Sequence, residues 1–290
     1  MMPDFLASEC TKRGPEARFH VLPVPLEATV SYGGGTAGGP AAILAASQQL
    51  EDWDGHSCPL EAGIHTCAAV DCSGGVEAAL ARIERATAAI LAQKRLPVLL
   101  GGEHSASLGA LRALARLRGN RSFGLIQIDA HADLREAYEG TKFSHACIAR
   151  RAVDDLGLPL FQFGCRAFSG AEAEFRKHHP AIHFLDAADF AAAGFPEQLL
   201  PPEFPDEVYL SFDVDGLDPA VIRATGTPVP GGPGWRACLS FVQRALAGRK
   251  VLGFDVMELA PQAGDRVSDF AAAQLVYALM GIVQRNEART

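Results

Sequence analysis

Three side chains that can bind a metal stand at strict two-residue spacing near the middle of the chain. An apolar run, residues 124–128, stops at Asp129, and His131 and Asp133 follow it. In an extended backbone, residues i, i+2 and i+4 point to one face, so these three side chains would converge. Carboxylate and imidazole ligands together suit a divalent transition-metal cation. The plainer alternative is a strand end whose acids face solvent.

Polar groups of the same kind follow three further apolar runs, each of which predicts a buried strand. Taken singly, each group has a structural explanation, since a lone histidine at a strand-to-helix turn is more often structural than a ligand. The runs at 97–100, 208–212 and 251–257 are followed by His104, by Asp213 and Asp215, and by Glu258, respectively.

The predicted strands alternate with amphipathic helices, for example at residues 76–94 and 108–118. This order predicts an α/β fold with a parallel sheet. Ligands bind such sheets outside the carboxyl ends of the strands. Four strand ends would therefore bring the acids and histidines to one edge, where burying so many like charges requires cations.

Six ligands are too many for one ordinary metal ion but suit two divalent ions that share bridging carboxylates. Two such ions generate a hydroxide nucleophile near neutral pH and polarise an electrophile. Four carboxylates balance two dications, so a bridging hydroxide and Glu258 leave the site net negative. A permanently protonated guanidinium is the substrate group that such a site prefers.

The bulk properties predict one domain over residues 1–290, with 1–18 as an N-terminal extension. The formal charge of −8 argues against a nucleic-acid surface, and no apolar run is long enough to predict a membrane span. Seven scattered cysteines and an acidic N-terminus without a signal-peptide pattern predict a cytoplasmic protein with reduced thiols. The glycine-rich stretch at 31–40 predicts a loop near the mouth of the site.

Three motifs together resemble the metal-binding signatures of the ureohydrolase (arginase/agmatinase) family. They are Gly-Gly-Glu-His-Ser at 101–105, Asp-Ala-His-Ala-Asp at 129–133 and Ser-Phe-Asp-Val-Asp-Gly-Leu-Asp-Pro at 211–219. The resemblance extends from the glycine-rich stretch to Ser268. It implies a three-layer α/β/α fold with a central, mostly parallel sheet of about eight strands, and a homo-oligomer, either a trimer or a hexamer.

The same resemblance implies a role for each site residue. His104, Asp129, Asp133 and Asp213 would hold one Mn²⁺, and Asp129, His131, Asp213 and Asp215 the other, although other divalent first-row metals tolerate these ligands. A metal-bridging hydroxide would attack the guanidinium carbon, and Asp133 would also orient it and help proton transfer. Glu258 would grip the guanidinium, His145 would shuttle protons at the rim, and Thr227 would line the substrate pocket.

The loop at 134–144 bears on the choice of substrate. It contains no asparagine, and Glu136 and Glu139 would suit a terminal ammonium better than a carboxylate. The loop is similar to that of prokaryotic agmatinases, which implies hydrolysis of agmatine to putrescine and urea. Alternatively, both glutamates face solvent and pair with Arg135 and Lys142.

Other substrates and one other class of protein stay open. A guanidinobutyrase, an arginase or a formimidoylglutamase would use the same chemistry, and a non-catalytic oligomeric relative would keep only the fold. Glu103 stands where many relatives have aspartate, a change that would act on His104.

Overall fold

A single parallel sheet forms the centre of the molecule. The computed structural model describes residues 2–119 and 122–287. Within them the sheet has eight strands in the order β2-β1-β3-β8-β7-β4-β5-β6, and every neighbouring pair is parallel. The strands are β1 Phe19–Val24, β2 Ile64–Thr66, β3 Leu96–Gly101, β4 Gly124–Ile128, β5 Leu160–Phe163, β6 Ile182–Leu185, β7 Glu207–Asp213 and β8 Lys250–Met257. The predicted parallel sheet of about eight strands is confirmed.

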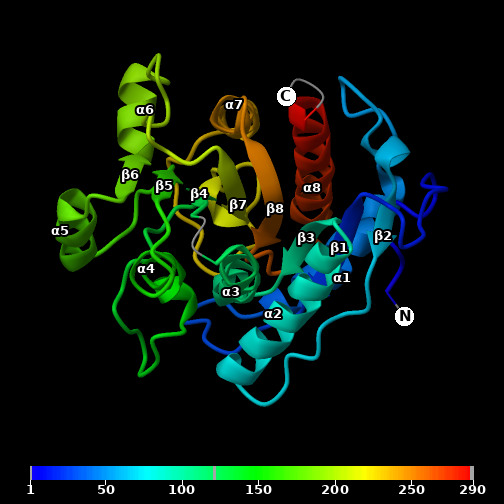
Figure 1. Ribbon diagram of the computed structural model, residues 1–290, viewed down its shortest axis with the longest axis horizontal. Helices are drawn as coiled ribbons and strands as arrows, with labels where there is room; N and C mark the ends of the chain where they lie inside the picture. The colour runs from blue at the N-terminus through cyan, green and yellow to red at the C-terminus, as the bar shows by residue number, and fades with distance from the viewer. Residues whose placement is uncertain (1, 120–121, 288–290) are drawn as a thin grey trace.

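Helices cover both faces of the sheet and make it the middle of three layers (Figure 1). α2, α3 and α4 pack on one face, and α1, α7 and α8 on the other. The α-helices are α1 Gly39–Ala46, α2 Val76–Ala92, α3 Ser107–Arg118, α4 Ile148–Asp154, α5 Gly170–His178, α6 Ala187–Ala193, α7 Trp235–Leu246 and α8 Arg266–Glu287. Short 3-10 helices span Thr36–Gly38, Ser47–Gln49, Pro59–Ala62, His104–Ala106, His145–Cys147 and Val214–Gly216.

The alternation of side chains along each strand supplies a separate hydrophobic core to each face. In β1, Phe19 and Val21 join the core beneath α1, α7 and α8. Leu22 and Val24 join the core beneath α2, α3 and α4. Strands that are apolar on both faces are expected in a parallel sheet that helices cover on both sides.

The elements β2 and α6 have no clear pattern in the sequence. β2 has three residues and α6 has seven, too few to give a clear period. The predicted N-terminal extension is packed onto the domain, because Phe5 and Leu6 are fully buried. The Leu6 N–H donates a 2.9 Å hydrogen bond to Ser47 Oγ.

α8 is the one helix among the described residues that is long and apolar enough to cross a membrane. Its apolar window is 61% buried inside the molecule. Leu275, Leu279 and Val283 belong to the core that it shares with α1 and α7. α8 is therefore buried as a core helix is, and this burial accounts for its apolar composition.

Candidate metal centre

The four strands that end in acids or histidines are direct neighbours in the sheet. β3, β8, β7 and β4 stand side by side, so their carboxyl ends form one continuous edge. Gly102 and Gly216 let the connecting backbone approach closely there. An added Cβ on Gly102 would lie 1.9 Å from the carbonyl oxygen of Leu26, and one on Gly216 would lie 2.8 Å from the Asp129 nitrogen. The sheet order thus brings together residues separated by more than a hundred positions.

His104 lies at the centre of a first group of ligands. Its Nδ1 lies 3.1 Å from Asp129 Oδ2, 3.2 Å from Asp133 Oδ2 and 3.2 Å from Asp213 Oδ2. All four side chains are buried. These are the four residues that the sequence analysis assigns to one metal ion.

His131 forms a second group that overlaps the first. Its Nδ1 lies 3.1 Å from Asp215 Oδ2 and 3.6 Å from Asp129 Oδ1. Asp129 therefore presents one oxygen to each histidine, which is the arrangement expected of a bridging carboxylate. Asp213, the other predicted bridge, belongs to the first group and not to the second, although its Oδ1 accepts a 2.9 Å hydrogen bond from the Asp215 N–H.

The orientation of His104 fits a metal ligand. Its buried Nδ1 has no hydrogen-bond partner among the described residues, although three carboxylate oxygens surround it. The opposite ring nitrogen, Nε2, lies 2.8 Å from Ser211 Oγ, and that hydroxyl donates to Asp255 Oδ1 at 2.8 Å. Because Ser211 donates to Asp255, it accepts from His104, so Nε2 carries a proton and Nδ1 is the nitrogen that faces the carboxylates. Such an outer partner commonly fixes a metal-binding histidine.

Burial and crowded charge shift the pKa values at the site. Burial, with the charge of Asp129, raises the pKa of Asp133 to about 7, and burial raises the pKa of Glu258 to about 8. Burial disfavours protonated His131, but the hydrogen bonds and charges of Asp129 and Asp215 outweigh it and raise its pKa to about 12. Without a cation, protons shared among these buried groups offset part of the negative charge of the carboxylates. A bound cation would displace those protons and offset the charge itself.

A cavity of about 190 Å³ opens onto these ligands. Glu258 and Thr227, two of the three predicted substrate-binding residues, line it, and so does His145, the predicted proton shuttle. Glu258 has a φ of 66°, and its Oε1 accepts a 2.6 Å hydrogen bond from the His104 N–H. Thr227 Oγ1 lies 3.5 Å from Asp215 Oδ2. Ser31, Arg135, Tyr138 and Ala146 complete the wall together with the ligands.

The charged side chains of the loop at 134–144 lie only partly where the sequence analysis expected them. Glu136 is exposed to solvent, as the alternative interpretation expected. It forms ion pairs with Arg150 and Arg151, however, and not with Arg135 or Lys142. Glu139 lies exposed at the tip of the Tyr138–Thr141 turn, outside the described cavity wall. Two side chains of this loop do line the cavity: Arg135, which is a cation, and Tyr138.

Thr29 and Glu103 support the rim histidine, a role that the sequence analysis missed. Thr29 Oγ1 accepts from the His145 N–H at 3.0 Å, lies 3.3 Å from His145 Nδ1, and donates to Glu103 Oε1 at 2.7 Å. Glu103 also accepts from the Thr29 N–H at 2.6 Å. The expectation that Glu103 acts on His104 is therefore replaced by an action on Thr29 and, through it, on His145. Glu103 was singled out in the sequence by its place beside His104 and by the aspartate that many relatives have there, whereas nothing in the sequence marked Thr29.

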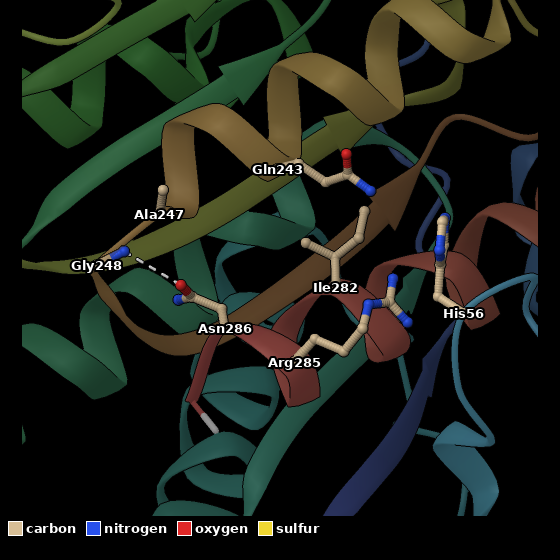
Figure 2. Close-up of a pocket in the computed structure, with 7 residues that line it drawn as sticks. All are labelled: His56, Gln243, Ala247, Gly248, Ile282, Arg285 and Asn286. Atoms are coloured by element: carbon tan, nitrogen blue, oxygen red, sulfur yellow. Dashed lines mark hydrogen bonds between the residues drawn. The ribbon is translucent and has the colours of Figure 1, made fainter. Parts of the chain in front are cut away.

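A larger cavity, of about 380 Å³, lies at the ends of α7 and α8 (Figure 2). Two of its polar side chains, Asn286 and Arg285, bond within the protein. Asn286 Oδ1 accepts a 3.2 Å hydrogen bond from the Gly248 N–H, and Arg285 Nη1 donates to Asp54 and to Ser57. It contains no cluster of metal ligands among the described residues, so the smaller cavity is the candidate site.

The fold and site define a parallel α/β protein with a carboxylate–histidine metal-binding cluster at the carboxyl edge of its sheet. The model of the arginase family matches residues 17–281. The N(1)-aminopropylagmatine ureohydrolase of Synechocystis is 37% identical over 287 residues, covering 96% of this chain and 92% of that protein. The agmatinase of Pyrococcus horikoshii is 31% identical over 280 residues, covering 93% of each.

A solved structure agrees with these relatives. The agmatine ureohydrolase of Thermoplasma volcanium superposes with a TM-score of 0.86 and 28% identity, covering all of this chain and 97% of that one. The chain belongs to the arginase family. It is a ureohydrolase, an enzyme that hydrolyses C–N bonds, and the family is one of metalloenzymes.

Proposed function

We propose that the chain hydrolyses agmatine to putrescine and urea with two manganese ions. The observation that carries the proposal is the cavity itself, which places Glu258 beside two overlapping groups of metal ligands. A guanidinium between them would face carboxylates on both sides. Its permanent charge matches that surrounding better than a neutral amide would.

Glu258 is oriented to bind the guanidinium. The His104 N–H holds Oε1, which leaves Oε2 to accept from the substrate. Burial raises the pKa of Glu258 to about 8, so the cost of its charge is met only when a cation lies beside it. A cationic group therefore binds here in preference to a neutral one.

Asp129, Asp133, Asp213 and Asp215, with His104 and His131, would hold the two ions. Bound there, the ions would supply a water molecule activated as a nucleophile. Asp133 lines the cavity and has oxygens beside the His104 group, so it is placed to take a proton from that water and pass it on to the leaving amine.

His145 would move protons between the cavity and solvent. It lies at the cavity wall, and burial lowers its pKa below the ordinary value of 6.5. The ring is therefore neutral at pH 7 and able to accept a proton. The Tyr138 ring packs edge-on against it, with the ring centroids 6.1 Å apart.

A second candidate substrate is N(1)-aminopropylagmatine, favoured by the names of similar proteins. The relatives from Synechocystis and Thermus thermophilus, 37% and 34% identical, carry that name, whereas the Pyrococcus agmatinase is 31% identical. Both substrates carry a guanidinium and an amine, and N(1)-aminopropylagmatine has in addition an aminopropyl arm, which adds three carbons and a second amine.

Urea release with manganese present tests the proposal. The substrates are agmatine, N(1)-aminopropylagmatine, 4-guanidinobutyrate and arginine at matched concentrations, compared by kcat/KM. Agmatine should give the highest value. A preference for the aminopropyl compound of tenfold or more would select the second candidate, and activity confined to guanidinobutyrate or arginine would contradict both. The trimer or hexamer and the cytoplasmic location stay predictions.

A further inference from the structure

A second cluster of metal-binding side chains lies on β1 and β2, away from the carboxyl edge. It consists of His20, His65 and Cys67, whose potential ligand atoms all lie within 4.8 Å of one another. His20 and His65 are register partners on the two parallel strands, and Cys67 follows His65 by two residues on the same face. Residues two apart on one strand point to the same face, so His65 and Cys67 can both approach His20 on the neighbouring strand.

The two imidazoles are held in complementary tautomers. His20 Nε2 lies 3.2 Å from the Pro15 carbonyl oxygen, and His65 Nδ1 lies 2.8 Å from the Arg13 carbonyl oxygen. A carbonyl oxygen can only accept, so each of these nitrogens carries the proton. The opposite nitrogens, His20 Nδ1 and His65 Nε2, therefore carry lone pairs. Metal-binding histidines in proteins are fixed in this way.

The surroundings keep His20 neutral, as a metal ligand must be. Burial lowers the pKa of His20, the Pro15 carbonyl opposes this, and the charges of His65 and Arg95 lower the pKa further. Cys67 Sγ lies 4.0 Å from His20 Nδ1, the nitrogen that bears the lone pair. Burial raises the pKa of the Cys67 thiol to about 11, so a bound cation would have to displace its proton.

The donor set selects the metal. One thiolate and two imidazoles suit Zn²⁺, which binds sulfur and nitrogen in tetrahedral geometry. Ligand atoms of such a site are about 3.3–3.6 Å apart, from typical Zn–S and Zn–N lengths, so these side chains, whose ligand atoms lie within 4.8 Å of one another, would move closer together on binding. His65 and Cys67 are partly exposed, which leaves the fourth position open to water.

We propose that His20, His65 and Cys67 form a mononuclear zinc site that joins β2 to β1. It is separate from the metal centre at the strand ends, because His20 lies near the amino end of β1 whereas that centre lies at the carboxyl edge. β2 has only three residues, at the edge of the sheet. A bound ion would hold this short strand in place.

Cobalt substitution tests the site without reference to activity. The chain is stripped with a chelator and titrated with Co²⁺, and the thiolate-to-cobalt charge-transfer absorption is recorded. The centre at the strand ends has only nitrogen and oxygen ligands, so it does not contribute to that band. The wild-type chain should show the band at one sulfur-bound Co²⁺ per chain, and Zn²⁺ should abolish it by displacement.

Three variants assign the band. Cys67→Ser and His65→Gln should each reduce it at least tenfold at the same cobalt concentration. Cys72→Ser is the matched control, since Cys72 is a partly exposed cysteine five residues further on that is outside the cluster, and it should keep the full band. Circular dichroism checks that each variant is folded. Absence of the band in the wild-type chain, or its survival in Cys67→Ser, would overturn the proposal.

Discussion

Ser211 controls which nitrogen of His104 faces the metal centre. Its hydroxyl accepts from His104 Nε2 and donates to Asp255, so Ser211→Ala removes the group that fixes the tautomer. We expect manganese affinity to fall by about 10- to 100-fold, the usual effect of losing an outer partner of a metal-binding histidine. Metal titration followed by calorimetry measures it. Unchanged affinity in a folded Ser211→Ala chain would show that the hydroxyl does not set the tautomer.

Thr29 should position His145 for proton transfer. Thr29→Val removes the hydroxyl that joins Glu103 to His145, while keeping the shape of the side chain. We expect kcat to fall by about tenfold, with KM and metal content unchanged, because the ring loses its orientation but not its contact with the cavity.

The matched control for this position is Thr29→Ser, which keeps the hydroxyl and should restore most of kcat. Steady-state kinetics of both variants, with metal analysis of each preparation, separates a positioning effect from loss of the metal. Loss of kcat in Thr29→Ser with wild-type kcat in Thr29→Val would instead indicate that the methyl group, and not the hydroxyl, is what matters.

Substituting Arg135 tests whether the far end of the substrate carries a positive or a negative charge. Arg135 lines the cavity, with its guanidinium 4.8 Å from the Tyr138 ring centroid and its Nε 3.8 Å from Glu172 Oε2. If the tail ends in an amine, Arg135→Gln removes a like charge and should lower KM by about two- to fivefold at low salt. A KM that rises several-fold would point to a carboxylate tail, as in guanidinobutyrate.

Glu139→Gln is the companion variant, because it changes a charge in the same loop outside the described cavity wall. Its KM should stay within twofold of the wild-type value. A substantial increase would restore the sequence-based assignment of Glu139 to substrate binding.

At the scale of the elements, the close contact between the ends of β7 and β4 sets the geometry of the site. Gly216, just after β7, has no side chain, and an added Cβ would lie 2.8 Å from the Asp129 nitrogen and 2.9 Å from Ile128 Cγ2. Gly216→Ala should lower the free energy of unfolding by about 1–3 kcal/mol, the usual cost of overpacking.

Gly170→Ala serves as the control for that substitution, since an added Cβ there meets no described atom within 4 Å. Urea denaturation with a chelator present compares the two folds without metal, and a manganese titration then compares their affinities. If Gly216→Ala is as stable as Gly170→Ala and binds manganese equally well, the contact does not constrain Asp129.

The long elements and the residues of the candidate metal centre were predictable from the sequence, because apolar runs or a helical period mark the elements and acids or histidines follow the strands. The runs that became β3, β4, β7 and β8 are mostly apolar, and acids or a histidine follow each one. Helical period identified α2. By contrast, β2 is defined by pairing with β1 across forty residues of chain, so no local pattern indicates it.

Contacts between distant segments were not predictable for the same reason. Thr29 reaches His145 across 116 positions, and Ser211 reaches His104 across 107. A threonine or serine has no spacing rule that would mark it as a partner of a particular histidine. The charge of Arg135 was visible in the sequence, but its direction depends on how the loop at 134–144 folds.

At the scale of the whole molecule, we expect metal binding and folding to be coupled, because the candidate ligands come from the ends of three strands, β3, β7 and β4. The buried carboxylates of Asp129, Asp133 and Asp213 repel one another unless a cation or shared protons compensate. A ligand bound a thousandfold above its dissociation constant adds about 4 kcal/mol of stability. For a domain of this size, that corresponds to a rise in Tm of roughly 10 °C.

Chelation should therefore lower Tm by about that amount, and added Mn²⁺ should restore it. Differential scanning calorimetry measures the shift in the wild-type chain and in His131→Ala, which lacks one ligand of the second group. Manganese should raise the Tm of His131→Ala much less, because one of the two ions is then poorly held. An equal rise in both chains would show that His131 is not a ligand, and a wild-type Tm indifferent to manganese would remove the coupling altogether.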